Sequence, residues 1–413
     1  MKHRIHQRCR FPNAASRLPM LHLTTRSYYA PSMRLLAAKR HFSASARHGQ
    51  ALRQPVEEID FQVTPAQFRR IAATAKDRVN AIVIRHQANP RSSLDPESSF
   101  DLAAELSALT RWFVRDEVTK RTCLSSEFRS ELHHNVPYEL IISKEDGSPF
   151  EEDESLIKFR HWISKKQHSP ALSYALESWA THEIQIRREK GRLMKDFMQF
   201  SAPLALFDAV LKYNQTRPEG CKPVGRLYVA QMPLTDLPPR LRPDVAPPKL
   251  LAAPTTPEVP FVCDIYSSSL WLGLQPTFTP WHRDPNDNLF CQLVGSKTVR
   301  LLPPEAGEQL FRKVTTELGK PGASATIRDE EMMNGAERRA WHEAVWGPGA
   351  PKSILETTVN ARDMLLIPKG WWHSVESTGG QRGDLNVSVN WWFRWRDPSL
   401  SSHRPPRKEG ISG

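Results

Sequence analysis

The sequence predicts a mainly β domain in the C-terminal part of the chain, preceded by helices. Apolar and short polar residues alternate between Asp384 and Arg394, which is the period of a strand with two different faces. Two further apolar runs meet at Gly295, which predicts a hairpin. Residues 51–200 instead carry apolar side chains at helical spacing, behind start signals such as Thr64 followed by Pro65.

The alternating strand has one face of Leu385, Val387, Val389 and Trp391, and an opposite face of Asn386, Ser388 and Asn390. A polar face can point to solvent or into a polar barrel interior. We favour the barrel interior, because short polar side chains suit a pocket that admits a small molecule.

The region before this domain, residues 51–220, is expected to be mainly helical. A short β-branched run at residues 81–84 is the exception and is typical of an early strand. Prolines crowd residues 238–260, which disfavours regular helix or a central strand there. We expect this segment to be an ordered connector that crosses the surface.

Three residues carry the strongest chemical signal. His282 and Asp284 are separated by one residue, and His373 follows far downstream behind an apolar run that ends in a turn. On an extended strand, residues i and i+2 point to the same side, so His282 and Asp284 can reach one ion. Two imidazoles and one carboxylate are the facial triad that holds non-haem Fe(II) and leaves coordination positions open.

Lys297 begins the return strand of the predicted hairpin. A fixed cation at this place could pair with the distal carboxylate of a dicarboxylic co-substrate bound to the metal. Tryptophans at 371–372 and 391–392 favour core packing, and alternation lets one member of each pair face the pocket. Arg283 could either contact the substrate at the mouth of the pocket or form a surface salt bridge.

With these motifs in place, residues 266–394 resemble the core of the JmjC-type, cupin-like oxygenases. The resemblance is closest to the hydroxylase branch that includes the asparaginyl hydroxylases. It rests on the motifs at residues 279–284 (TPWHRD), 295–297 (GSK), 367–373 (IPKGWWH) and 390–393 (NWWF), and on Asn288. It implies a mainly β fold with α, a double-stranded β-helix of the cupin or jelly-roll type framed by N-terminal helices, with the catalytic domain at 221–400.

The resemblance also implies cofactors and roles. Fe(II) would be bound by His282, Asp284 and His373, and the co-substrate would be 2-oxoglutarate. Its far carboxylate would be held by Lys297 and Thr279, and Asn288 and Asn390 would line its path. The stretch 225–231 (GRLYVAQ) is similar to an early strand of the family, which makes Tyr228 a further carboxylate contact.

Residues 305–350 depart from the family pattern. This charged insert is expected to be helical and supplies no obvious ligand. His342 lies within it and is expected to be a solvated helix residue and not a metal ligand. The tail at 401–413 is expected to be disordered.

The amino-terminal segment has the composition of a targeting sequence. Residues 1–50 contain two lysines, eight arginines and no Asp or Glu, so they carry most of the net charge of +12. Arg-rich, Ser-containing and acid-free composition is the signature of a mitochondrial transit peptide, and residues 40–46 (RHFSASA) resemble a matrix-processing site. The alternative is a basic arm that touches nucleic acid. We expect the protein to be located in the mitochondrial matrix.

Composition narrows the partners. The nearly neutral remainder of the chain argues against a nucleic-acid partner, and no apolar run approaches the roughly 18 residues that span a bilayer. The 5 cysteines lack the spacing of a zinc site or a disulfide framework. The sequence is compatible with a homodimer.

The sequence thus predicts a mitochondrial Fe(II)- and 2-oxoglutarate-dependent dioxygenase that hydroxylates a protein side chain. Alternatives within the family are an N-methyl-lysine demethylase and an RNA hydroxylase. An alternative of another class is a catalytically silent cupin-like binding protein, which an intact triad together with Lys297 argues against.

Overall fold

The computed structural model describes residues 54–60, 65–73, 80–86, 105–142, 153–166, several residues between 170 and 177, 197–252, 262–320 and 335–396. The predicted leader at 1–50 and the predicted tail at 401–413 lie outside these residues. No helix in the described ranges is both long and apolar enough to cross a bilayer.

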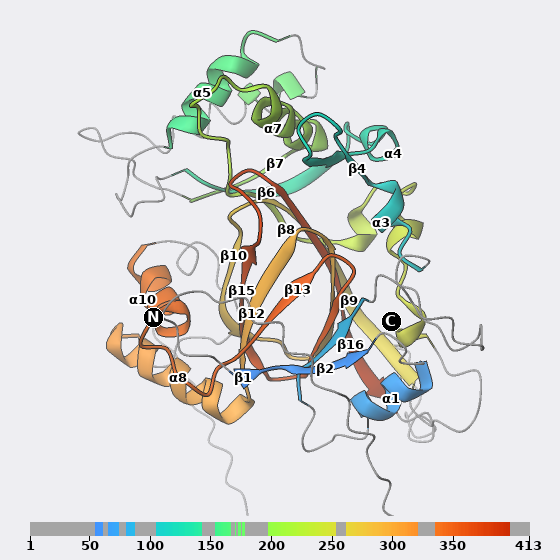
Figure 1. The fold of residues 1–413 in the computed structure, drawn as a ribbon, viewed down its shortest axis with the longest axis vertical. Helices are drawn as coiled ribbons and strands as arrows, with labels where there is room; N and C mark the ends of the chain where they lie inside the picture. Colours follow the sequence, from blue (N-terminus) through green and yellow to red (C-terminus); the bar gives the residue numbers. More distant parts are fainter. Residues whose placement is uncertain are drawn as a thin grey trace, which may run out of the picture. The chain divides into compact units, whose positions relative to one another are not determined.

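Two β-sheets form the centre of the described chain (Figure 1). The smaller has the strand order β1-β13-β12-β15-β10, and the larger has the order β2-β3-β14-β11-β16-β9-β8-β6-β7. The smaller sheet contains β1 (Gln54–Pro55), β10 (Phe278–Arg283), β12 (Ser296–Leu302), β13 (Leu355–Asn360) and β15 (Trp372–Thr378). The larger contains β2 (Glu57–Asp60), β3 (Ile82–Arg85), β6 (Asn135–Ile141), β7 (Phe197–Pro203), β8 (Leu227–Pro233), β9 (Val262–Leu274), β11 (Asp287–Val294), β14 (Met364–Ile367) and β16 (Leu385–Arg396).

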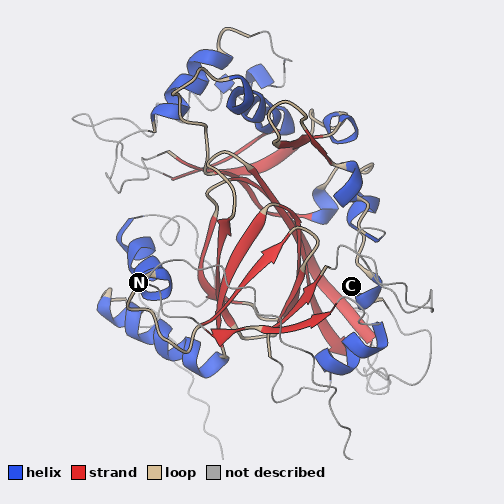
Figure 2. Ribbon diagram, in the orientation of Figure 1, coloured by secondary structure: helices blue, strands red, loops and turns tan. Residues whose placement is uncertain are grey.

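The two sheets face each other across one cavity, because side chains of β10, β12 and β15 line it together with side chains of β8, β9, β11 and β16. The pairing is antiparallel between the strands that line the cavity. This arrangement confirms the predicted mainly β fold of the cupin or jelly-roll type. Figure 2 shows the helices outside the strands.

The alternation in β16 has the predicted consequence. Its apolar residues, Leu385, Val387, Val389 and Trp391, pack outward into the large core that the helices share with the larger sheet. Its polar residues Asn386, Ser388 and Asn390 are 0 to 1% exposed and face the barrel interior. The prediction that this polar face points into the barrel interior is therefore confirmed.

The described part of the N-terminal region contains both helices and strands. Its helices are α1 (Pro65–Ala73), α3 (Ala108–Arg111), α4 (Ser126–Arg129), α5 (Glu154–Ile163) and α7 (Leu204–Thr216). A mainly helical region at 51–220 stays a prediction, because residues 87–104, 143–152 and 178–196 lie outside the described chain. The strands β6 and β7 extend the larger sheet, and β4 (Phe113–Arg115) pairs with β5 (Thr122–Leu124). The expected early strand at residues 81–84 is confirmed as β3, which pairs with β2 and β14.

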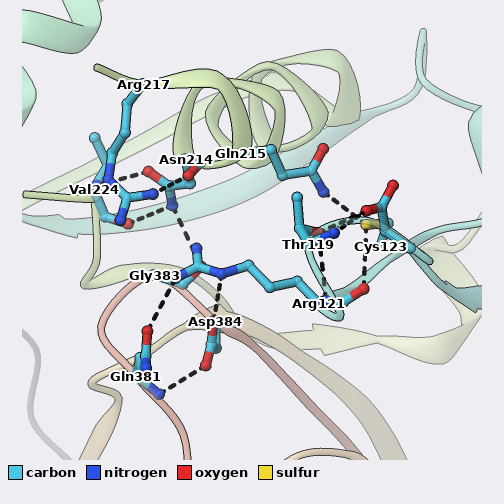
Figure 3. A network of polar contacts seen from close by, with 11 residues as sticks. Thr119, Arg121, Cys123, Asn214, Gln215, Arg217, Val224, Gln381, Gly383 and Asp384 are labelled. Atoms are coloured by element: carbon cyan, nitrogen blue, oxygen red, sulfur yellow. Dashed lines mark hydrogen bonds and ion pairs between the residues drawn. The ribbon is translucent and has the colours of Figure 1, made fainter. Parts of the chain in front are cut away.

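A polar network ties this region to the barrel (Figure 3). Arg121, beside the β4–β5 hairpin, donates to Gln381 and lies 3.5 Å from the Asp384 carboxylate in the turn before β16. Asn214 of α7 bonds the backbone of Val224 and Gly383. The hairpin, α7 and the turn before β16 are thus held together.

The insert at 305–350 forms α8 (Pro304–Glu317) and α10 (Gly335–Trp346), which confirms its helical character within the described residues. Both helices cover the outer face of the smaller sheet, where Phe311 and Trp341 pack with Trp372. Gly307 lies so close to Trp372 that a β-carbon there would be 2.1 Å from the ring. The insert therefore supports the strand that carries His373.

The proline-dense connector is ordered between residues 234 and 251, where it forms the 3-10 turns η1 (Leu234–Asp236), η2 (Arg242–Val245) and η3 (Lys249–Leu251). Leu237, Leu241 and Leu250 are buried in the large core. The connector therefore packs against the domain and does not merely cross its surface. Residues 253–260 of it lie outside the described chain.

Candidate metal centre and adjoining pocket

The three predicted ligands meet at one point. His282 and His373 are register partners on the paired strands β10 and β15. The Asp284 carboxylate lies 3.9 Å from His282 Nε2 and 3.7 Å from His373 Nε2, and one ligand atom from each residue lies within 4.8 Å of the others. One detail differs from the prediction, because β10 ends at Arg283 and Asp284 lies just beyond it. The turn still brings the carboxylate to the two imidazoles.

Backbone and amide groups orient each ligand. His282 Nδ1 lies 2.8 Å from the Pro280 carbonyl, and His373 Nδ1 lies 3.2 Å from the Trp371 carbonyl. A proton shared with these carbonyls leaves both Nε2 atoms as acceptors toward the common point. Orientation by such partners is what metal ligands require.

Three linked hydrogen bonds orient the Asp284 carboxylate. Asn288 donates to Asp284 Oδ2 at 2.8 Å, Asn390 donates to Asn288 Oδ1 at 3.0 Å, and Trp271 Nε1 donates to Asn390 at 2.8 Å. The resemblance to the family implied that both asparagines line the path of the co-substrate. The structure places them on the cavity wall and adds this bracing role.

The electrostatics of the cluster fit a cation. Asp284 is 7% exposed and has no Lys or Arg partner among the described residues, so its buried charge is uncompensated by the protein. Burial, together with the neighbouring His282, lowers the pKa of His373 to about 4. A neutral imidazole is the form that binds metal. Two imidazoles and one carboxylate form a donor set that fits Fe(II).

Lys297 lies at the other end of the cavity. Its ammonium lies 2.7 Å from the Ser388 hydroxyl and 3.3 Å from the Tyr228 hydroxyl, and it has no carboxylate partner among the residues described. The side chain is 2% exposed, and burial lowers the pKa of Lys297 to about 7. Thr279 lines the same space, so the predicted residues Lys297, Tyr228 and Thr279 are brought together.

The cavity between these two ends has a volume of about 220 Å³. Its walls include Trp271, Phe290 and Trp392, so one member of the second tryptophan pair faces the pocket as the sequence allowed. Phe290 lies two residues after Asn288 on the same strand face, a signal that sequence reasoning missed. Trp271 could not be found locally, because it is opposite Ser388 only through the pairing of β9 with β16.

Arg283 and His342 lie near the cluster without joining it. Arg283 lines the mouth, lies over the Trp372 ring, and is 3.6 Å from Glu308 of α8, so both predicted roles remain compatible with its position. His342 is half-exposed on α10 and lies 3.0 Å from Glu376. It is a helix residue outside the ligand cluster, as predicted, although it is paired with a carboxylate.

Comparison with known proteins agrees with this geometry. Curated relatives include the lysine-specific demethylases JMJ30 and JMJ31 of Arabidopsis thaliana, which are 25% identical over 244 residues and 29% identical over 177 residues. Lysine-specific demethylase 8 of Xenopus tropicalis is 25% identical over 226 residues. These alignments cover 59%, 41% and 53% of this chain, and 49%, 28% and 45% of the relatives, so the chain spans at most about half the length of each.

Residues 156–398, more than half of the chain, match the family described as the cupin-like domain. The JmjC and cupin-like resemblance is confirmed, and Fe(II) and 2-oxoglutarate, the predicted cofactors, fit both this family and the donor set. The closer placement beside the asparaginyl hydroxylases stays a prediction. The chain belongs to the cupin-like domain family.

Proposed function

We propose that this protein is an Fe(II)- and 2-oxoglutarate-dependent dioxygenase that hydroxylates a protein side chain. One observation carries the proposal. A buried triad of metal donors and a buried lysine without a carboxylate partner in the described chain lie at opposite ends of one cavity. A metal-binding scaffold has no need of the second element, and a dicarboxylic co-substrate needs both.

In this proposal His282, Asp284 and His373 hold the iron, and Lys297 with Tyr228 and Thr279 binds the far carboxylate of 2-oxoglutarate. Iron, 2-oxoglutarate and O₂ together supply the oxidation that inserts one oxygen atom into a C–H bond and releases succinate and CO₂. The chain contributes orientation and exclusion of water. Trp271, Phe290 and Trp392 provide apolar surface around the reacting group.

The lining of the cavity supports hydroxylation over demethylation. Among the described residues that line it, Asp284 is the only acidic one, and the proposal commits its carboxylate to the metal. A methylated lysine would bring a cation into this space without an acidic side chain to balance it, whereas a neutral side chain needs none. N-methyl-lysine demethylation remains the second candidate, because relatives of the chain are named lysine-specific demethylases.

The test compares proteins from cells with and without the gene by mass spectrometry. Hydroxylation predicts peptides that lose an oxygen-addition modification in the absence of the gene, with restoration by the parental chain but not by His282→Ala. A gain of methylated lysine without any lost oxygen addition would favour the demethylase. Oxygen additions confined to RNA would favour an RNA hydroxylase.

We further propose that the enzyme acts in the mitochondrial matrix. The composition of residues 1–50 supports this address, and these residues lie outside both the described chain and the matched domain. The proteins of the matrix are then the place to look for the substrate.

A further inference from the structure

The inner face of β16 leads from the buried end of the cavity to the surface. Ser388 is 0% exposed and Asn390 is 1% exposed, Trp392 is half-buried, and Arg394 is exposed. Ser388 contacts Lys297, whereas Asn390 and Trp392 line the cavity beside the triad. Arg394 continues this face beyond Trp392, at the exposed end of the strand.

The guanidinium of Arg394 is fixed in place there. Its Nε donates to the Asn286 side-chain oxygen at 2.6 Å, and its Cζ lies 4.8 Å from the centre of the Tyr266 ring. Asn286 is 3% exposed and lies two residues after Asp284, so the fixed end of this contact belongs to the turn that carries a metal ligand. Tyr266, in contrast, is 65% exposed at the bulge where β9 shifts its register against β16.

Arg283, which lines the cavity, and Arg394, at the exposed end of β16, differ in one respect. Arg283 has a carboxylate neighbour in Glu308. Arg394 has no carboxylate partner among the described residues, although Asp264 is its register partner on β9. Within the described chain its two terminal NH₂ groups have no hydrogen-bond partner, so they can bind from outside, and a guanidinium presents a planar fork that matches a carboxylate.

We propose that Tyr266, Asn286 and Arg394 form a rim subsite that binds an acidic side chain of the polypeptide substrate close to the residue that is modified. This inference rests on the proposed function, because it assigns a sequence preference to the same active site. Arg394 pairs with the carboxylate, Asn286 holds the guanidinium in place, and the exposed Tyr266 ring adds apolar contact for the neighbouring part of the chain.

The test is selection from a random peptide library with blocked ends, so that carboxylates come from Asp and Glu side chains alone. The full chain is loaded with Fe(II) and 2-oxoglutarate without oxygen, which keeps bound peptides unmodified. We expect the parental chain to enrich Asp and Glu, and the enriched peptide to bind Arg394→Ala about fivefold more weakly, the upper range for an exposed ion pair. Arg394→Glu should reverse the preference toward Lys and Arg.

Arg115→Glu, on the separate strand β4, is the matched control and should keep the acidic preference. An acidic preference that survives in Arg394→Glu, or its absence from the parental chain, would overturn the rim subsite. The absorption band of the Fe(II) and 2-oxoglutarate complex is recorded on the same samples. A parental chain that lacks this band contradicts the proposed function, whereas an intact band without acidic preference contradicts only the rim subsite.

Discussion

Replacing Lys297 by Met tests how the far end of the cavity binds 2-oxoglutarate. Met fills nearly the same volume and removes only the charge and the donors. In the parental chain the ammonium is 2% exposed and is held by two hydroxyl groups, from Ser388 and Tyr228, with no anion in the described chain to balance it. The co-substrate carboxylate would supply the missing charge.

The pH dependence of 2-oxoglutarate binding follows from the pKa of Lys297. Burial lowers the pKa of this side chain from 10.5 to about 7, which corresponds to about 5 kcal/mol against the charged form. The charged form binds the carboxylate, so the affinity is constant below pH 7. Above pH 7 binding requires uptake of a proton, and the affinity falls by about tenfold for each pH unit until the raised pKa of the complex is reached.

The assay is anaerobic titration of the Fe(II)-loaded chain with 2-oxoglutarate between pH 6.5 and about 8.5. At pH 7, Lys297→Met should bind about 10-fold to 150-fold more weakly, the range for a lost charge-assisted hydrogen bond, and should show no pH slope of this kind. Lys369→Met, at an exposed lysine outside the cavity, should match the parental chain. Equal affinity in Lys297→Met and the parental chain would refute the assignment of Lys297.

Three further predictions concern the residues that support the metal site and the location of the protein in the cell. Asn288→Ala should weaken metal retention by about 10-fold to 100-fold, because Asp284 loses its orienting donor; unchanged retention in a chelator competition would contradict this. Trp341→Ala should lower the free energy of unfolding by about 3–5 kcal/mol in a urea titration, and a loss below 1 kcal/mol would show that the insert does not share the core. A fusion of residues 1–50 to a reporter should enter mitochondria and be shortened, whereas Glu at Arg40 and the nearby arginines should leave it in the cytosol; nuclear accumulation of the full chain would count against the address and favour a demethylase.

The C-terminal barrel was predictable because its signals are local. The spacing of His282 and Asp284, the hairpin at Gly295 and the alternation in β16 each lie within a few residues. The structure brings Lys297, Tyr228 and Thr279 together at one end of the cavity and the triad at the other. The triad and Lys297 followed from their local spacing, whereas the roles of Tyr228 and Thr279 followed only from the resemblance to the family.

The N-terminal strands were not predictable in the same way. β6 pairs with β7 and β8, whose partner residues are 56 or more positions away, and Pro137 within β6 argues locally against a strand. Val136, Tyr138 and Leu140 alternate as buried residues, but three positions are a weak signal beside helical neighbours. The bracing of Asp284 by Asn288 was also hidden, since it depends on how the turn after β10 folds back.

The most direct test of the account is the visible spectrum of the chain under argon with one equivalent of Fe(II) and an excess of 2-oxoglutarate. A triad that leaves open positions for the keto acid predicts a weak charge-transfer band in the parental chain, and no band in His282→Ala or Asp284→Ala. His342→Ala, at the histidine outside the ligand cluster, should keep the band. A band of equal intensity in the parental chain and in both ligand variants would contradict the assignment of the metal centre.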